Sequence, residues 1–251
     1  MTPTQKSRKI ASERFLRVRN AGITFTRQLR HVARQIGMII EGMAPGGLVE
    51  DYPALSAALN RYSQLLGPWA KNISLRMIAE INQRDEKAWI TTGREIGRGL
   101  KGEIADLRQS GIIQDLAKLQ VELITSLPTQ ASQRVHGLVI EGMSDGTRAA
   151  DIAKEIRRTG QITESRAMLI ARTEVARTAS TLTQARAESI GSDSYIWRTS
   201  NDSDVRDLHK KLNGKIFRWD DPPINGENDS RGHPGTTFNC RCYAEPIIPD
   251  A

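Results

Sequence analysis

Apolar residues recur at intervals of three to seven along the first half of the chain, a spacing typical of amphipathic helices. The first such set predicts one or two helices that end at the Pro–Gly turn of residues 44–47. Further patterns predict helices over 53–67, 69–107 and 112–127, because Gly67–Pro68 and Pro128 are expected to end the helices that precede them. The first set comprises Ile10, Phe15, Val18, Phe25, Leu29, Val32, Ile36 and Ile39.

The segment 133–189 carries three more helical patterns. Thr147 is a candidate N-terminal cap for the second pattern, and Gly160 is expected to end it. Thr163 then caps a long helix that reaches Ser189, with Gly191 placed just beyond its end. Residues 147–170 therefore resemble a helix-turn-helix, although the second helix is too long and too apolar for a compact DNA-recognition helix.

After residue 194 the period changes from helical to alternating. Tyr195, Trp197 and Thr199 alternate with Ile196 and Arg198, which predicts a strand. Asn213–Gly214 predicts a tight turn, a loop rich in Pro and Gly follows, and residues 240–247 are expected to form a closing strand. We therefore predict a predominantly α-helical α+β protein, with long helices in the N-terminal two-thirds and a small β-containing C-terminal module. The predicted division lies between residues 1–127 and 128–251.

Charge is concentrated at the N-terminus. The chain has 251 residues and a net charge of +7, yet its first 36 residues hold nine Lys or Arg against one Glu. The remainder is close to neutral, so the basic character belongs to an arm, residues 1–36. Such an arm suits nucleic acid or an acidic protein surface, and it also suits a merely solvated helix face. Its candidate contact residues are Lys6, Arg8, Lys9, Arg14, Arg17 and Arg19.

No apolar run approaches the length that a membrane span requires. We find no secretory signal pattern, and synthesis in a reducing cytoplasm is the expectation.

The residues with the most reactive side chains gather near the C-terminus. Cys240 and Cys242 are the two cysteines of the chain, and His209 and His233 precede them. Cysteines two apart in a strand would present both sulfurs on one side, where a disulfide between them is geometrically poor but a soft metal fits. We predict a structural zinc site of these four residues, with Asp202 and Asp204 as alternative oxygen ligands.

Two other interpretations stay open for these residues. The cysteines and histidines could be ordinary structural side chains. They could instead form the active site of a metal-dependent hydrolase, or Cys240 and His233 could form a nucleophilic pair. Because nothing in the sequence marks an oxyanion hole or an orienting third group, no enzyme is predicted. Glu174 is expected to pair with Arg177, three residues later on its helix, rather than to act as a base.

The order of several motifs resembles a known family. Residues 170–174 read Ile-Ala-Arg-Thr-Glu, and Asp202, Val205–Arg206, His209 and His233–Pro234 precede a terminal Asn-Cys-Arg-Cys at 239–242. Together they resemble the tailed-phage minor head proteins, the phage head morphogenesis or Mu F-like family, over residues 128–246.

This resemblance implies a structural protein of the virion head, present in few copies at the portal vertex and made in the host cytoplasm. Its implied partners are the portal protein, other capsid components and packaged DNA, with no membrane and no small-molecule substrate. It implies a role in capsid assembly and in DNA packaging or delivery. The alternative is a DNA-binding protein that uses the basic arm or segment 147–170; the metal-dependent hydrolase is weaker still.

Overall fold

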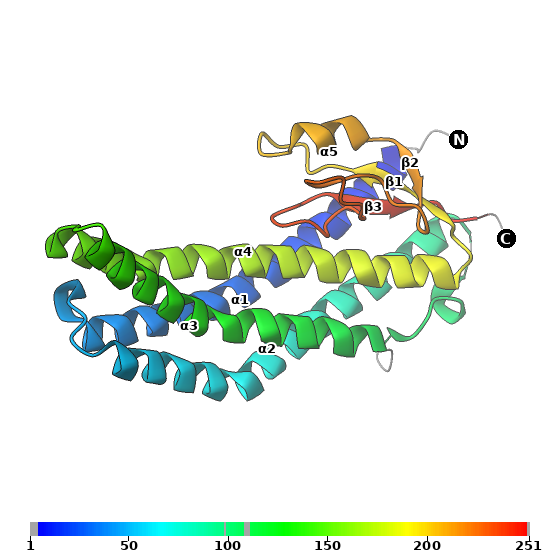
Figure 1. Cartoon of the computed structure of the whole chain (residues 1–251). Helices are drawn as coiled ribbons and strands as arrows, with labels where there is room; N and C mark the ends of the chain where they lie inside the picture. Colours follow the sequence, from blue (N-terminus) through cyan, green and yellow to red (C-terminus); the bar gives the residue numbers. More distant parts are fainter. Residues whose placement is uncertain (1–4, 98, 108–110, 250–251) are drawn as a thin grey trace. The chain divides into compact units, whose positions relative to one another are not determined.

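Long helices dominate the computed structural model, which describes residues 5–97, 99–107 and 111–249, with side chains from residue 21 onward (Figure 1). The predicted class, a predominantly helical α+β protein, is confirmed. In chain order the elements are α1 (Gln5–Met43), the short 3-10 turn η1 (Pro45–Gly47), α2 (Tyr52–Glu95), a second 3-10 turn η2 (Leu100–Gly102), α3 (Gly111–Ser144), α4 (Ala149–Ser189), β1 (Ser194–Arg198), α5 (Asp207–Leu212), β2 (Ile216–Arg218) and β3 (Tyr243–Pro246).

The chain divides into two compact units, and the long helices pass through both. Unit 1 contains residues 1–23, 75–116 and 172–251, and unit 2 contains 24–74 and 117–171. Each unit thus collects segments from both halves of the sequence, and the predicted domain boundary at 127/128 falls within α3.

Unit 2 is built from four helical segments around an aliphatic core. Leu29 and Ile36 of α1, Leu59 of α2 and Ile124 of α3 are completely shielded from solvent, and Ile156 of α4 is nearly so. Burial of such side chains stabilises the folded chain by about 1.5–3 kcal/mol each, measured against an exposed reference. Leu29 and Ile36 belong to the periodic apolar set found in the sequence, whereas the side chains of Ile10, Phe15 and Val18 from that set lie outside the described residues.

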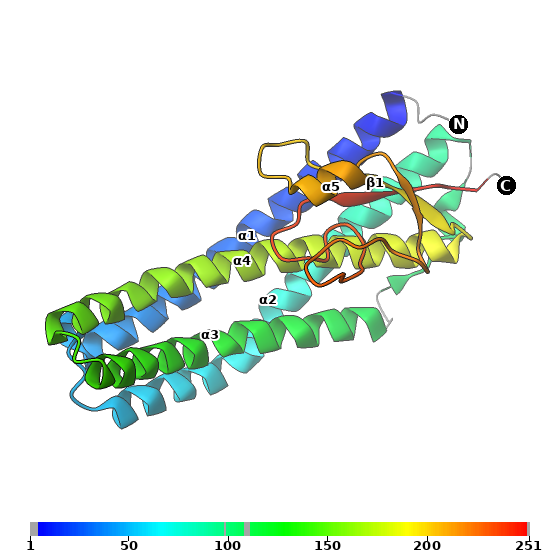
Figure 2. The same ribbon diagram turned by 45° about the horizontal axis from the view of Figure 1, so that its top comes forward.

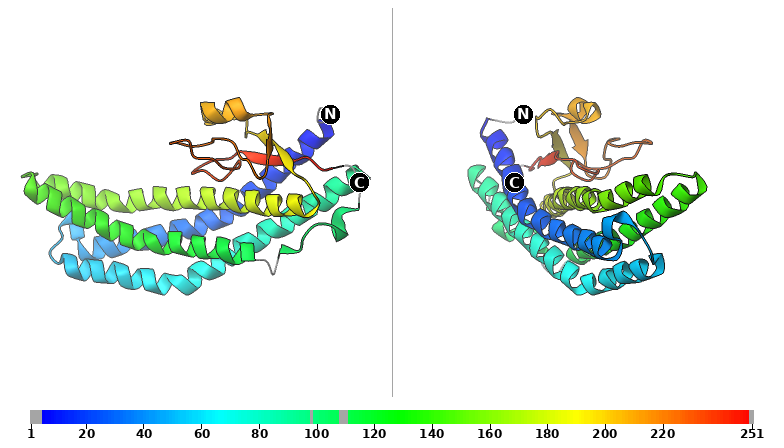
Figure 3. Two further views of the ribbon diagram at one scale, coloured as in Figure 1. Left: turned by 45° about the vertical axis from the view of Figure 1, so that its right-hand side comes forward. Right: turned by 90° about the vertical axis from the view of Figure 1, so that its left-hand side faces the viewer.

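Unit 1 adds a small antiparallel sheet beside the C-terminal end of α4 (Figure 3). The strand order is β2-β1-β3, with Tyr195 opposite Phe217 and Trp197 opposite Ala244. Tyr195 and Trp197 point to one side of β1 and are fully buried, as the alternating pattern predicts. They pack in one cluster with Trp89 of α2, Trp219, Cys240 and Cys242.

A buried ion pair joins α2 and α4 inside unit 1. The guanidinium of Arg186 lies 2.7 Å from Asp85 Oδ2 and donates a second hydrogen bond, also 2.7 Å, to the side-chain oxygen of Asn82. Thr183 donates to the other Asp85 oxygen at 2.7 Å. A buried charge needs this degree of pairing because desolvation otherwise costs several kcal/mol, on the order of 3–5 when one partner is lost.

Two predicted helix ends at proline were wrong. Pro68 lies inside α2 and Pro128 inside α3. A proline removes one backbone hydrogen bond from a helix, but burial of neighbouring residues offsets that loss. Leu66 and Ala70 are buried around Pro68, as are Leu127 and Ala131 around Pro128. The predicted continuation of the helix to residue 107 was also wrong, because α2 ends at Glu95.

The predicted helix end at Gly160 was wrong as well, since α4 runs unbroken from Ala149 to Ser189 (Figure 2). A Cβ added at Gly160 would lie 3.4 Å from the Cα of Gly37, so this glycine allows α1 and α4 to approach closely. Residues 147–170 therefore contain no turn between two helices, and the helix-turn-helix interpretation is withdrawn.

Other boundaries follow the sequence. Helix α1 ends at Met43, next to the predicted turn, and Gly191 takes a φ of 77° just after α4. The closing strand begins at Tyr243 rather than at residue 240, so the two cysteines lie in the segment that leads into β3. None of the helices in the described part of the chain has an apolar stretch suited to crossing a membrane.

Candidate metal centre

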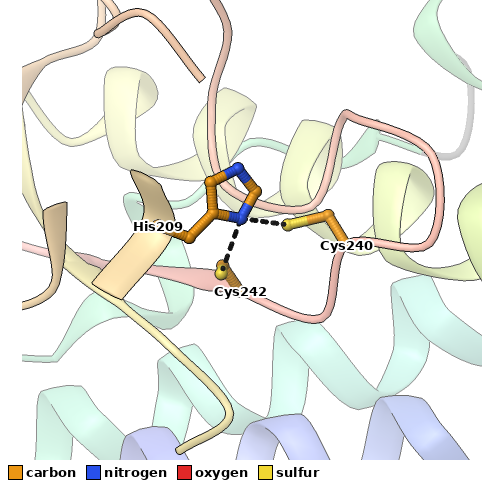
Figure 4. Close-up of side chains that lie close together, drawn as sticks. All are labelled: His209, Cys240 and Cys242. Carbon is orange, nitrogen blue, oxygen red and sulfur yellow. Dashed lines mark hydrogen bonds between the residues drawn. The ribbon is translucent and has the colours of Figure 1, made fainter. Parts of the chain in front are cut away.

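His209, Cys240 and Cys242 come together in unit 1 (Figure 4). His209 lies in the short helix α5, and the cysteines lie directly before β3. The Nδ1 atom of His209 is 3.6 Å from Cys240 Sγ and 3.5 Å from Cys242 Sγ. Each of the three residues is at most 6% exposed. Neither cysteine forms a disulfide.

The backbone around the cluster sets which nitrogen of His209 faces the sulfurs. The Nε2 atom lies 2.9 Å from the carbonyl oxygen of Asn225, which can only accept a hydrogen bond, so Nε2 carries a proton and donates it. In the neutral ring Nδ1 then holds a lone pair that is directed between the two sulfurs. This is the tautomer and orientation in which a histidine ligates a metal, held by a hydrogen bond on its other nitrogen. The edge of the Trp197 ring packs against the imidazole, with ring centroids 5.3 Å apart.

The spacing of these atoms fits a tetrahedral zinc ion. Zinc–sulfur bonds of about 2.3 Å and zinc–nitrogen bonds of about 2.0–2.1 Å, at tetrahedral angles, place nitrogen and sulfur about 3.6 Å apart. The two N···S distances in the cluster are 3.6 and 3.5 Å, and all three ligand atoms lie within 4.8 Å of one another. A thiol–imidazole hydrogen bond has a similar length, so the geometry suits both a metal-free and a metal-bound cluster.

Without a metal, the cluster favours one negative sulfur. The hydrogen bond from the Cys242 thiol, followed by the interaction with His209, lowers the pKa of Cys240 to about 4, against the opposing effect of burial. The same proximity to Cys240, together with burial, raises the pKa of Cys242 well above its ordinary value. Burial alone would lower the pKa of His209, but its hydrogen bonds to Cys240 and to the Asn225 carbonyl raise it overall. These directions favour a thiolate at Cys240 and extend to higher pH the range in which His209 is protonated.

The structure does not bring His233 into this cluster. Its Nδ1 atom lies 3.1 Å from the hydroxyl oxygen of Tyr195, and its ring packs against the rings of both Tyr195 and Trp219. Burial lowers the pKa of His233, which favours its neutral form. His233 is connected to the cluster only indirectly, since its backbone carbonyl accepts a hydrogen bond from the side chain of Asn225 at 3.2 Å.

The alternative oxygen ligands are engaged elsewhere. Asp202 and Asp204 lie 2.8 and 3.1 Å from the guanidinium of Arg241, the residue between the two cysteines. The predicted pairing of Glu174 with Arg177 is confirmed, at 2.7 Å. The six candidate contact residues of the basic arm lie in the first part of α1, where the structure describes the backbone alone; they are Lys6, Arg8, Lys9, Arg14, Arg17 and Arg19.

Two residues that complete the site were not found from the sequence. Asn225 acts through its backbone carbonyl, for which no residue type is diagnostic. Trp197 was assigned to a buried strand face, and its contact with His209 depends on where α5 lies relative to β1. The Pro and Gly residues around Asn225 predicted an irregular loop, but they did not indicate which backbone carbonyl would face a histidine.

The fold and this cluster define a helical protein with a small β module that buries a Cys-Cys-His set. Residues 133–245 match the family model described as "Phage Mu protein F like protein". The match confirms, over these residues, the resemblance found in the motifs. The family indicates a phage head morphogenesis protein as the functional class.

A relative from a bacterium matches about half of the chain. A protein of Haemophilus influenzae (strain Rd), whose name is given as "Uncharacterized protein", is 38% identical over 128 residues. The match covers 51% of this chain but 28% of that relative, so the chain spans well under two thirds of its length. No solved structure matches the chain.

Proposed function

We propose that this chain is a structural minor head protein of a tailed phage, bound at the portal vertex and active in capsid assembly. The observation that carries the proposal is the family match over residues 133–245. The portal protein and other capsid components are its proposed partners, with packaged DNA as a further contact during packaging or delivery. The proposed location is the virion head, reached after assembly in the host cytoplasm.

A structural role for the cluster is supported by its burial. His209, Cys240 and Cys242 are 2%, 3% and 6% exposed. A catalytic zinc keeps one coordination position open to water or substrate, whereas a structural zinc is enclosed. We therefore propose a structural zinc held by these three residues and a fourth donor outside the set, and we favour this role over a hydrolase.

The metal proposal is tested by the zinc content of purified protein, measured by mass spectrometry. We expect one zinc per chain in the wild type and none in the Cys240→Ser, Cys242→Ser double variant. His209→Gln should lose the metal, and His233→Gln is the matched control, which should keep it. Equal loss in both histidine variants would favour the four-residue site predicted from the sequence, and zinc retained by the double cysteine variant would overturn the proposal.

The assembly role is tested by co-expression with the portal protein of the same phage. We expect the two proteins to co-elute in size-exclusion chromatography at physiological salt. Elution of the chain alone, with the portal protein fully assembled beside it, would contradict a portal-bound role.

The basic arm favours DNA as a second partner, because nine of the first 36 residues are Lys or Arg. Neutralising several phosphates makes the affinity for DNA fall steeply with salt, with a slope of about −0.9 per neutralised phosphate on a double-logarithmic plot. A variant with Arg8, Lys9 and Arg14 changed to Gln should bind DNA more weakly, and its affinity should fall less steeply with salt. If the wild type shows no affinity even at low salt, the arm instead faces protein.

A further inference from the structure

The loop that leads to Cys240 is fastened to one face of α4. The hydroxyl oxygen of Thr173 accepts a hydrogen bond of 3.0 Å from the backbone N–H of Asn239, the residue before Cys240. Arg177 donates a hydrogen bond of 3.2 Å to the carbonyl oxygen of Thr236. Thr173 and Arg177 are four residues apart, so both lie on the same face of the helix. Two polar contacts thus hold the loop 235–239 at its two ends.

The backbone of this loop also approaches α4 directly. A Cβ added at Gly235 would lie 3.1 Å from the carbonyl oxygen of Ala176 and 3.2 Å from that of Cys242. Gly235 has a φ of 89°, which a residue with a side chain rarely adopts. The loop therefore passes between α4 and the backbone of the second cysteine, where a side chain at this position would not fit without a shift.

Glu174 fixes the arginine that reaches the loop. Its side chain is 1% exposed and lies 2.7 Å from the Arg177 guanidinium, which is itself partly buried. Burial raises the pKa of Glu174, against the opposing effect of Arg177. An arginine tied to a buried carboxylate has fewer orientations, so its second nitrogen stays directed at the Thr236 carbonyl.

From these contacts we infer that Thr173 and Arg177 are positioning residues of the metal site. They hold loop 235–239 on α4, and the loop in turn fixes Cys240 relative to His209, which belongs to a separate element. This inference rests on the proposed zinc site. Because binding and docking are linked equilibria, a bound metal stabilises the docked loop and the docked loop raises the affinity for metal. The Ala-Arg-Thr-Glu motif at residues 171–174 thereby gains a role, since two of its four members support the cysteines.

The test compares variants that remove the anchoring groups. Thr173→Val keeps the shape of the side chain and removes its acceptor, and Thr173→Ser keeps the hydroxyl. Loss of such supporting contacts typically lowers metal affinity by about 10- to 100-fold. We expect a decrease of that size for Thr173→Val, measured by competition with a chromophoric chelator, and recovery of most of the affinity in Thr173→Ser. Thr163→Val is the matched control, because Thr163 is a buried threonine of α4 whose hydroxyl bonds within its own helix.

Two further readouts separate positioning from general destabilisation. Cobalt substitution reports the thiolate ligands through its absorption bands, which should change in Thr173→Val and stay unchanged in Thr163→Val. Hydrogen exchange of the peptide that contains Asn239 should slow on metal binding in the wild type and respond less in Thr173→Val. If Thr173→Val does not fold, the paired change Glu174→Gln, Arg177→Met tests the other anchor without leaving a buried charge unpaired.

The outcomes distinguish the inference from the metal site itself. A wild type that binds neither zinc nor cobalt overturns both. A wild type that binds zinc through both cysteines, with Thr173→Val of equal affinity and equal cobalt spectrum, overturns only the role of α4.

Discussion

Buried charge separates the two units of this molecule. Among the residues whose side chains the structure describes, the buried acidic, basic and histidine residues Asp85, Glu174, Arg186 and His209 all belong to unit 1. The buried polar residues of unit 2 are uncharged, and its core is mostly aliphatic. Unit 2 therefore depends on apolar packing between helices, whereas unit 1 depends on polar pairs that each need a specific partner.

This difference follows from what each unit has to hold in place. A helix satisfies the hydrogen bonds of its own backbone, so helices that lie side by side need only an apolar face between them. Unit 1 must also fix a three-stranded sheet and long irregular loops, whose backbone groups find partners in side chains such as Thr173 and Arg177. Removing one polar partner should therefore harm unit 1 more than unit 2.

The largest effect is expected for Arg186→Met in unit 1. This change leaves the buried Asp85 carboxylate without its guanidinium and should lower the free energy of unfolding by about 3–5 kcal/mol. The matched change in unit 2 is Arg134→Met, because Arg134 pairs with Glu155 at 3.2 Å with both side chains about one third exposed. That exposed pair should contribute about 0–1 kcal/mol. Urea unfolding followed by tryptophan fluorescence measures both, and equal losses would contradict the comparison.

The next largest effect tests the apolar core of unit 2. Leu59 of α2 is fully buried, and Leu59→Ala should lower the free energy of unfolding by about 2–4 kcal/mol through lost burial and a cavity. Leu65, on the same helix, is 70% exposed and serves as the control. Leu65→Ala should change stability by less than about 0.5 kcal/mol. A similar cost for both leucines in thermal unfolding would show that burial in this unit is not what stabilises it.

The two units also differ in how much of their structure could be predicted from the sequence. Apolar periodicity was sufficient to predict the long helices and the fold class, and alternation was sufficient for β1. The breaker residues Pro68, Pro128 and Gly160 were misleading because their effect depends on helices packed against them, which lie far away in sequence. Local signals cannot report such contacts.

The sequence was sufficient to predict the kind of ligands in the candidate site, but not which residues come together there. Cys240, Cys242 and His209 could be chosen because cysteine and histidine are the ligands that zinc prefers. His233 was chosen on the same ground, yet the loop that carries it turns its ring toward Tyr195. Asn225 and Thr173 contribute through a backbone carbonyl and a hydroxyl, groups too common in any sequence to single out.

The smallest effect, and the most specific to the cluster, is the number of protons released when zinc binds. Thiolate and neutral imidazole are the forms that bind a metal, so each proton present beforehand must leave. Cys240, with a pKa of about 4, should release none above pH 6, and Cys242, whose pKa is raised, should release one. His209 has a raised pKa and adds a second proton only while the pH is below it.

Zinc binding should therefore release about two protons at pH 6, and the number should fall toward one as the pH rises through the raised pKa of His209. The affinity for zinc should rise with pH throughout. Calorimetric titration in buffers of different ionisation enthalpy measures this number directly. If the two thiols and the imidazole had their reference pKa values, zinc binding would instead release roughly three protons at pH 6. That result would mean that the sulfurs and the imidazole do not share their protons before the metal arrives, and that the hydrogen bonds of His209 do not preorganise the site.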